Sequence, residues 1–132
     1  MPERRFHTAT VVASTRAVEQ WWREADGPHG PLLRWFTPAE LTALASRRNP
    51  VSAVAARLAG KAAVRKVLAR AGLETRLLPS LVDIQLSRDG DGRPVADVPA
   101  AVALWLCRSQ LGLDVSLSHD ERQVLASAVV AP

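Results

Sequence analysis

Two consecutive helix signals constrain the fold of this chain more than any other part of its sequence. Thr37-Pro38-Ala39-Glu40 places threonine, proline and glutamate at the N-cap, N1 and N3 positions, which is the capping-box pattern. It predicts a helix that runs to Arg48 and is broken by Asn49-Pro50. A longer helix is expected directly afterwards, over residues 51–71, with Gly72 as its C-terminal cap. Any fold for this chain must accommodate these two helices in succession.

Strand signals lie on both sides of the two helices. Residues 6–13 are rich in β-branched side chains and precede a helical pattern over residues 15–25. Residues 81–86 and 93–98 flank Asp89-Gly-Asp-Gly92, whose turn chemistry predicts a β-hairpin. Pro99 opens a further helix that Gly112 is expected to close, and two last strands are expected at 113–118 and 124–131. The order β-α-α-α-β-β-α-β-β predicts an α+β domain.

Length and composition narrow the class of protein. The chain has 132 residues, 17 Lys+Arg against 13 Asp+Glu, a net charge of +4 and one cysteine. This length suits a single domain, 1–132, and the lone Cys107 excludes a disulfide framework or a cysteine-rich zinc site. No apolar run is long enough for a membrane span and no secretory signal is present, so we expect a cytoplasmic protein. The excess of positive charge favours anionic partners. Nucleic acid is the least favoured of these partners, because the basic residues are scattered along the chain.

Two groups of residues are candidates for binding phosphate. Ser116, Ser118 and His119 lie at the end of an expected strand and could present hydroxyl, imidazole and backbone N–H groups to a phosphate. Taken alone, this segment is better explained by local turn bonds of Ser118 and Asp120. Arg57, Lys61 and Arg65 recur at every fourth position and form a cationic stripe on the long helix. Taken alone, the stripe is better explained as a solvated helix face. Trp21 and Trp22 are expected in the core or an interface rather than as a base-stacking platform.

Several segments follow one another in the order of known family motifs. Phe36-Thr-Pro-Ala-Glu-Leu41 resembles F-T-x-x-E-L, and the segment Arg57 to Leu68 resembles R-F-A-A-K-E-A-x-x-K-A-L. The segment Asp83 to Pro94 resembles D-I-E-V-x-x-D-x-x-G-x-P, and Val115-Ser-Leu-Ser-His119 resembles V-S-I-S-H before a terminal A-V-A-x-V strand. Together they resemble the holo-acyl carrier protein synthase family, the small trimeric 4′-phosphopantetheinyl transferases.

The resemblance implies a fold, a reaction and a set of site residues. In that family, two carboxylates hold Mg²⁺ on the pyrophosphate of coenzyme A while a carrier-protein serine attacks the β-phosphorus. The resemblance therefore implies a homotrimer with sites between subunits, coenzyme A as candidate cofactor and an acidic acyl carrier protein as candidate partner. It implies Lys61 and His119 as catalytic residues. Its candidate residues for the phosphates of coenzyme A are Arg57, Lys61, Lys66, Ser116, Ser118 and His119.

The chain departs from the family at both metal positions. The carboxylate of the first strand falls at about Ser14, or at Ala13 with one residue of slip, and the glutamate of K-E-A is replaced by Ala62. Because Mg²⁺ needs hard oxygen ligands, these replacements disfavour Mg²⁺. A surviving transferase would need a substitute carboxylate, for which the candidates are Glu19, Glu24, Asp83 and Asp114.

Three functions remain open from the sequence. The first is a divergent transferase acting on a carrier protein. The second is a metal-independent cyclase or isomerase that acts on a polyketide or peptide intermediate, with His119 as proton donor. The third is a non-catalytic module that docks acidic carrier proteins through the stripe of Arg57, Lys61 and Arg65.

Overall fold

The computed structural model describes residues 6–24, 30–120 and 122–132, and it confirms the expected α+β order. Three short 3₁₀ segments that the sequence patterns did not indicate lie between the longer elements: η1 (Gly30–Arg34), η2 (Thr75–Leu77) and η3 (Leu81–Asp83). In chain order, the helices and strands are β1 (His7–Ser14), α1 (Thr15–Glu24), α2 (Pro38–Ala45), α3 (Pro50–Arg70), β2 (Gln85–Arg88), β3 (Pro94–Asp97), α4 (Ala100–Arg108), β4 (Gly112–His119) and β5 (Gln123–Ala131).

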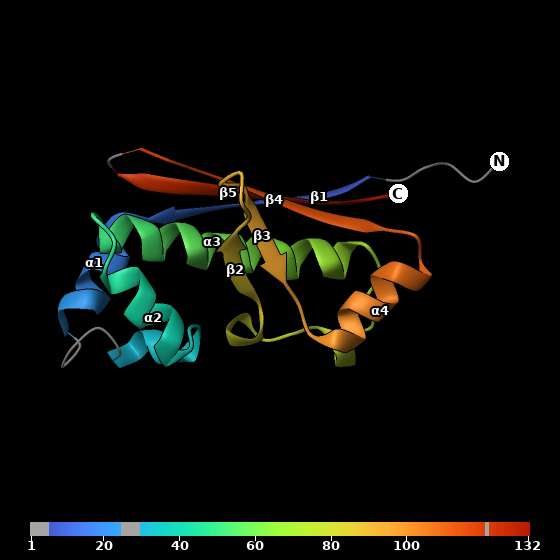
Figure 1. Cartoon of the computed structure of the whole chain (residues 1–132), viewed down its shortest axis with the longest axis horizontal. Coiled ribbons are helices and arrows are strands. Elements are labelled where there is room, and N and C mark those ends of the chain that lie inside the picture. The colour runs from blue at the N-terminus through green and yellow to red at the C-terminus, as the bar shows by residue number, and fades with distance from the viewer. Residues whose placement is uncertain (1–5, 25–29, 121) are drawn as a thin grey trace.

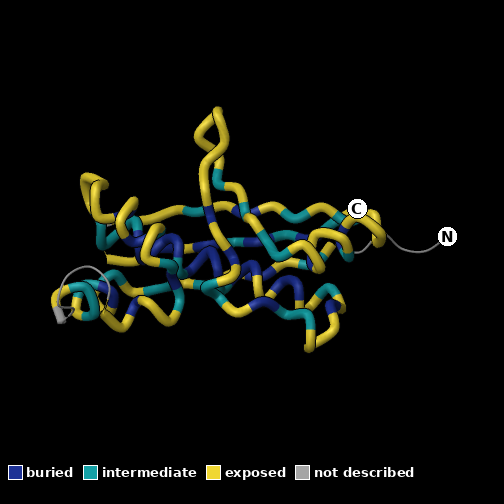
Figure 2. Tube along the Cα trace, turned by 60° about the horizontal axis from the view of Figure 1, so that its bottom comes forward, coloured by how far each residue is buried: buried dark blue, intermediate teal, exposed yellow. Residues whose placement is uncertain are grey.

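The core lies between α3 and a three-stranded antiparallel sheet of order β1-β5-β4, along which α3 runs (Figure 1). Alternate residues of the central strand, Val124, Ala126, Ala128 and Val130, are buried on the side of α3. The helix contributes Ala55, Ala59 and Ala63 to the same cluster, and these small side chains allow close approach. Figure 2 shows the buried residues along the middle of the molecule and exposed residues at the loop tips. The other face of the sheet is open, with Val12 55% and Leu125 39% exposed.

The capping box at the start of α2 is confirmed. The Glu40 amide donates to Thr37 Oγ1 at 3.1 Å, and the Thr37 amide donates to Glu40 Oε1 at 3.0 Å. The predicted end of this helix at Arg48 is wrong, because the Arg47 amide bonds to the Leu44 carbonyl three residues back and the chain leaves the helix after Ala45. Arg47 and Arg48 are thereby placed in the loop that leads into α3.

Helix α3 begins and ends one residue before the predicted range of 51–71, and the glycine expected after its last turn is confirmed. Asn49 Oδ1 accepts from the Ser52 amide, and Gly72 has a φ of +98° beyond the last turn. The Leu73 amide bonds to the Leu68 carbonyl at 3.1 Å, which completes a Schellman motif. Among the described residues, no helix has both the length and the apolar character that a membrane-spanning segment requires.

Two predicted boundaries elsewhere are wrong for local reasons. The strand expected over 81–86 begins only at Gln85, because Leu81 to Asp83 wind into η3 with the Ile84 amide bonded to the Leu81 carbonyl. Gly112 does not close α4. Gln110, with a φ of 56°, takes the left-handed position instead, and Gly112 is already the first residue of β4.

Gly60 allows the β2–β3 hairpin to lie close to α3. A Cβ at this position would be 2.4 Å from Leu86 Cδ1 and 3.0 Å from Leu117 Cδ2, so both leucines occupy the space that a side chain would need. Strand β2 therefore crosses near the middle of α3 (Figure 1). Its last residue, Arg88, lines the same cavity as Leu117 and His119 of β4.

Candidate functional site

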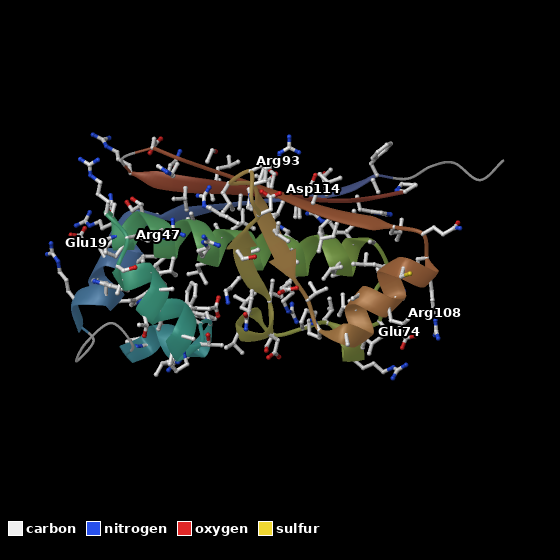
Figure 3. All side chains as sticks on the ribbon, in the orientation of Figure 1. Glu19, Arg47, Glu74, Arg93, Arg108 and Asp114 are labelled. Carbon is white, nitrogen blue, oxygen red and sulfur yellow. The ribbon has the colours of Figure 1, made fainter. Side chains whose placement is uncertain are left out.

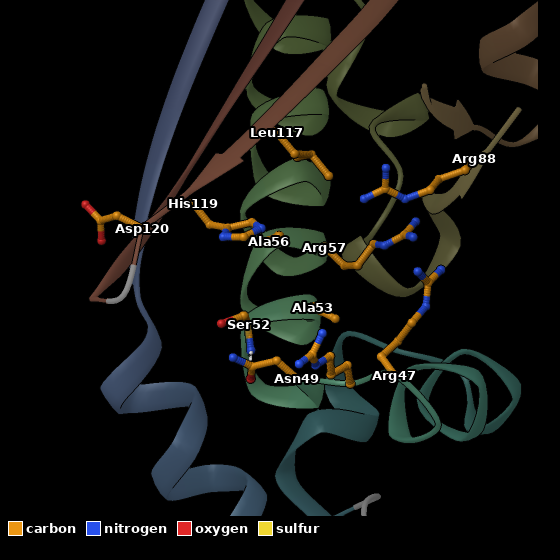
Figure 4. A pocket seen from close by; sticks show the side chains of 11 residues that line it. Arg47, Asn49, Ser52, Ala53, Ala56, Arg57, Arg88, Leu117, His119 and Asp120 are labelled. Carbon is orange, nitrogen blue, oxygen red and sulfur yellow. Dashed lines mark hydrogen bonds between the residues drawn. The ribbon is translucent and has the colours of Figure 1, made fainter. Parts of the chain in front are cut away.

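A cavity of about 680 Å³ lies at the N-terminal end of α3 (Figure 4). Four separate parts of the chain form it: the loop before α3, the first two turns of α3, the end of β2 and the end of β4. Its charged and titratable lining residues are Arg47, Arg48, Arg57, Arg88, His119 and Asp120; the others are Asn49, Ser52, Ala53, Ala56 and Leu117. We call this cavity the arginine pocket.

Three guanidinium groups converge in the arginine pocket. Arg47 reaches it from the loop, Arg57 from α3 and Arg88 from the end of β2, and their side chains extend into one region (Figure 4). Arg57 is only 7% exposed and donates through Nη1 to the Leu86 carbonyl of β2. Burial lowers the pKa of Arg57, and the positive charges of Arg47 and Arg88 lower it further, whereas Glu40 opposes the shift. Like charges are thus crowded at this point.

A second cavity, of about 340 Å³, adjoins the arginine pocket and shares these three arginines. Its remaining walls are more apolar, with Ala43, Leu44 and Leu86 beside Glu40 and Ser87. The arginines therefore lie between a strongly basic cavity and a partly apolar one. This arrangement suits a ligand that combines an anionic group with a less polar part.

The chemistry of the arginine pocket is that of anion recognition. Guanidinium groups bind phosphate and carboxylate oxygens in bidentate fashion, and the N-terminal end of α3 adds partial positive charge. Among the lining residues that the structure describes, Asp120 is the single carboxylate. Its Oδ1 accepts from the Arg122 and Gln123 amides at 2.8 and 2.9 Å, and these bonds lower the pKa of Asp120. Asp120 therefore acts as the cap of the β4–β5 turn.

The structure brings together only two of the residues that the sequence indicated for phosphate binding, Arg57 and His119. Ser116 and Ser118 share one face of β4, as predicted, but Leu117 and His119 point to the opposite face. Ser116 lines a separate cavity on the outer face of the sheet. Lys66 lines another one on α3, together with Ala62 and Arg65.

Sequence reasoning missed Arg47, Arg48 and Arg88 as site residues. Arg47 and Arg48 could have been found from their position immediately before the Asn49-Pro50 helix start. Basic side chains beside the positive end of a helix favour an anionic ligand. Arg88 carried no comparable signal, because only the packing of β2 against α3 brings it to the pocket.

Lys61 lies in the core rather than in the arginine pocket, with 0% of its surface exposed. Its Nζ donates to the Trp35 carbonyl at 2.9 Å, to Glu40 Oε1 at 3.0 Å and to the Leu81 carbonyl at 3.1 Å. It also lies 4.7 Å from the centre of the Phe36 ring. These bonds use all three ammonium donors, so Lys61 joins the start of α2, α3 and η3 from inside the protein.

The prediction of a solvated cationic stripe is therefore wrong. Arg57 and Lys61 are buried, and of the three stripe residues only Arg65 is exposed, with its Nε bonded to the Pro79 carbonyl at 3.1 Å. The i, i+4 spacing was correctly identified, but that side of α3 is covered by the segment from Pro79 to Leu86. A docking surface made of these three residues is excluded as well. Trp21 is partly buried, with its ring centre 5.2 Å from that of Trp35, as expected for a packing residue.

Ser14 and Ala62, the two residues that the motif comparison aligned with metal carboxylates, offer no carboxylate oxygen to a Mg²⁺ ion. Ser14 Oγ accepts from the Arg16 amide at 3.2 Å, and Ala62 lies beside the cationic Arg65 and Lys66. The substitute carboxylates are occupied elsewhere: Glu19 pairs with Arg23 at 2.6 Å, Asp83 accepts from Ser80 at 2.8 Å and Asp114 accepts from the Val115 amide. The side chain of Glu24 lies outside the described part. Within that part, no three His, Cys, Asp or Glu residues gather as metal ligands would.

The chain matches no family model, and no curated protein matches its sequence. Solved structures are similar over almost its whole length. A holo-[acyl-carrier-protein] synthase from Neisseria meningitidis is 27% identical with a TM-score of 0.74, over 96% of this chain and 97% of that one. The Helicobacter pylori enzyme in complex with coenzyme A is 22% identical with a TM-score of 0.71, over 93% and 98% of the two chains. The Bacillus anthracis enzyme in complex with coenzyme A (3′,5′-ADP) is 18% identical with a TM-score of 0.72, over 98% of each chain. The chain therefore has the fold of the holo-acyl carrier protein synthases.

Proposed function

We propose that the protein binds coenzyme A in the arginine pocket and acts in acyl carrier protein or coenzyme A chemistry. The observation that carries this proposal is the convergence of Arg47, Arg57 and Arg88 beside His119 at the N-terminal end of α3. Coenzyme A offers phosphate groups to such a cluster and a less polar nucleoside to the adjoining cavity. The complexes of the Helicobacter pylori and Bacillus anthracis enzymes with this cofactor support the choice of ligand.

The proposal includes a homotrimer with an acidic acyl carrier protein as partner. The open face of the sheet, with Val12 and Leu125 exposed, offers apolar surface for contact between copies. Contact between copies would also give a role to Lys66 and Ser116, which line separate cavities, and to Ser118, which shares its face of β4 with Ser116. The net charge of +4 favours an acidic partner protein.

Transfer of the phosphopantetheine arm is the less favoured activity, because Ser14 and Ala62 offer no carboxylate and the described residues gather no donor set for Mg²⁺. The favoured alternative is a metal-independent reaction in the same cavity, with His119 as proton donor. One observation supports it: the His119 side chain is exposed and lines the arginine pocket. An exposed imidazole that lines a cavity is placed to reach a substrate bound there, as a general acid must be.

Calorimetric titration with coenzyme A tests the proposal. We expect saturable binding by the wild-type protein and binding weakened about tenfold or more by Arg88→Ala, because one charge-assisted hydrogen bond contributes about 1.5–3 kcal/mol. Arg108→Ala is the matched control, because Arg108 is exposed on α4 at the opposite end of the molecule from Arg47 (Figure 3). Absence of binding to wild type, or equal weakening by the two variants, contradicts the proposal.

A second assay separates the two activities. The protein is incubated with coenzyme A, Mg²⁺ and an apo carrier protein, and the carrier is then weighed by mass spectrometry. A gain of the phosphopantetheine arm establishes transfer. Coenzyme A binding without that gain favours the metal-independent or non-catalytic function.

A further inference from the structure

The β2–β3 hairpin is anchored to α3 near its base, at Leu86. The Leu86 side chain is only 8% exposed and fills the space beside Gly60, and its carbonyl accepts a hydrogen bond from Arg57 Nη1. Beyond this point, the hydrogen bonds that the structure describes for residues 87–95 all lie within the hairpin. In the described part of the chain, Leu86 is therefore the last hydrogen-bonded contact of β2 with α3.

Arg88 depends on this anchor for its place in the arginine pocket. It follows Leu86 by two residues on one strand, so both side chains lie on the same face of β2. Arg88 and Arg57 line the same cavity (Figure 4). Burial lowers the pKa of Arg57, and the positive charges of Arg47 and Arg88 lower it further, so these groups repel one another. The repulsion favours movement of the hairpin away from α3, and the bond from Arg57 to Leu86 opposes that movement.

Arg57 is less accessible to a ligand than its two neighbours. It is only 7% exposed, whereas Arg47 and Arg88 are both exposed. One terminal nitrogen of its guanidinium group is also committed to the Leu86 carbonyl. An arginine that binds a phosphate or carboxylate usually offers its planar fork to the ligand, which the exposed arginines can do more freely.

The bond from Arg57 is one of three similar bonds along α3. Lys61 Nζ donates to the Leu81 carbonyl at 3.1 Å. Arg65 Nε donates to the Pro79 carbonyl at 3.1 Å. Cations one turn apart on α3 thus bond to backbone carbonyls of a single covering segment, residues 79–86. The repetition indicates that the cations on this side of α3 hold the backbone of that segment in place.

We propose that Arg57 is a positioning residue, which fixes β2 on α3 through the Leu86 carbonyl and thereby places Arg88 in the arginine pocket. Contact with the ligand then falls to the exposed Arg47 and Arg88. The inference deepens the proposed function and rests on it only for the binding test below. The placement of the hairpin is a property of the ligand-free protein.

Hydrogen–deuterium exchange of the ligand-free protein tests the placement directly. Arg57→Met removes the donor and keeps much of the side-chain volume, and Arg57→Gln is a second, shorter variant should the first fail to fold. Amides of β2 and β3 should exchange about tenfold faster, and those of β1 and β5 at the wild-type rate, because the lost contact is local. Arg57→Lys keeps a charged donor and should restore most of the protection. Arg47→Met, the control, removes an exposed charge from the same pocket and should not accelerate exchange.

Calorimetric titration with coenzyme A tests the effect on the site. Arg57→Met should weaken binding about tenfold in the otherwise wild-type protein. In the Arg88→Ala background the same substitution should weaken it by less than about threefold, because its effect is exerted through Arg88 and the two changes are then not additive. A residue that contacts the ligand independently would lose the same factor in both backgrounds.

Three results would overturn the inference. The first is hairpin exchange that stays at the wild-type rate in Arg57→Met and Arg57→Gln, or that Arg57→Lys does not restore. The second is faster exchange throughout the protein, which would make Arg57 a general stabilising residue. The third is an equal loss of binding with and without Arg88. If the wild-type protein does not bind coenzyme A, the proposed function is rejected, and the exchange measurement alone decides the role of Arg57.

Discussion

The buried Lys61 should be the most sensitive single position for the stability of this protein. Replacing it by methionine keeps the length and most of the volume of the side chain but removes its charge and its three donors. Two backbone carbonyls, of Trp35 and Leu81, then lose their partner, and the Glu40 carboxylate loses an ion pair of 2.9 Å. The Glu40 side chain is only 14% exposed, so water replaces the ammonium poorly.

The magnitude follows from the burial of the pair. Removing one partner of a buried ion pair costs about 3–5 kcal/mol, because an uncompensated charge remains. Unfolding entropy of about 2.1 cal/mol/K per residue gives about 0.28 kcal/mol/K for 132 residues. Lys61→Met should therefore lower the melting temperature by about 11–18 °C.

Urea unfolding followed by circular dichroism measures the change in free energy directly. Lys66→Met is the matched control: it lies on the same helix but is exposed, and should change stability by no more than about 0.5 kcal/mol. The double variant Lys61→Met/Glu40→Gln should recover part of the loss, because glutamine retains the acceptor for the Thr37 amide without a buried charge. A loss below about 1 kcal/mol for Lys61→Met would refute the reasoning, because so small a value is typical of exposed pairs.

Three further predictions concern the backbone and the turn beside the arginine pocket. Gly72→Ala should lower the free energy of unfolding, measured in urea, by about 1–2 kcal/mol, because Gly72 has a φ of +98°. Gly90→Ala is the control and should be nearly neutral: a Cβ has open space at both positions, but Gly90 is not among the glycines with a positive φ. Gly60→Val should lower the free energy of unfolding by about 1–3 kcal/mol, because the new side chain would collide with Leu86 and Leu117. It should also weaken phosphate binding measured by calorimetry, because β2 carries Arg88. Unchanged binding would show that the position of the β2–β3 hairpin does not affect the site. The hydrogen bonds from the Arg122 and Gln123 amides lower the pKa of Asp120 below 3.8, so they contribute stability that is present above pH 3.8 and lost as the pH falls through the lowered value. Asp120→Asn should therefore flatten the acid side of a plot of unfolding free energy against pH. An unaltered plot would contradict this role.

The sequence by itself determined the elements whose signals are local. The capping box of Thr37 and Glu40, the left-handed Gly72 and the turn between β2 and β3 depend on hydrogen bonds within a few residues, so the residue types alone indicate them. The boundaries that failed, at Arg48 and Gly112, are places where a 3₁₀ bond or a non-glycine left-handed residue ended the helix early. The ordered motifs also indicated the fold, because they preserve the spacing of elements rather than any one contact.

Only the tertiary structure decided which charges are buried and which meet. The i, i+4 spacing places Arg57, Lys61 and Arg65 on one side of α3, but it does not say that the segment from Pro79 to Leu86 covers that side. Arg47 and Arg88 come together because β2 packs over Gly60, a contact between residues far apart in the chain. Helix and turn propensities act within a few residues, whereas the arginine pocket depends on packing between distant segments. The basic composition therefore anticipated an anionic ligand, and the fold determined where that ligand can bind.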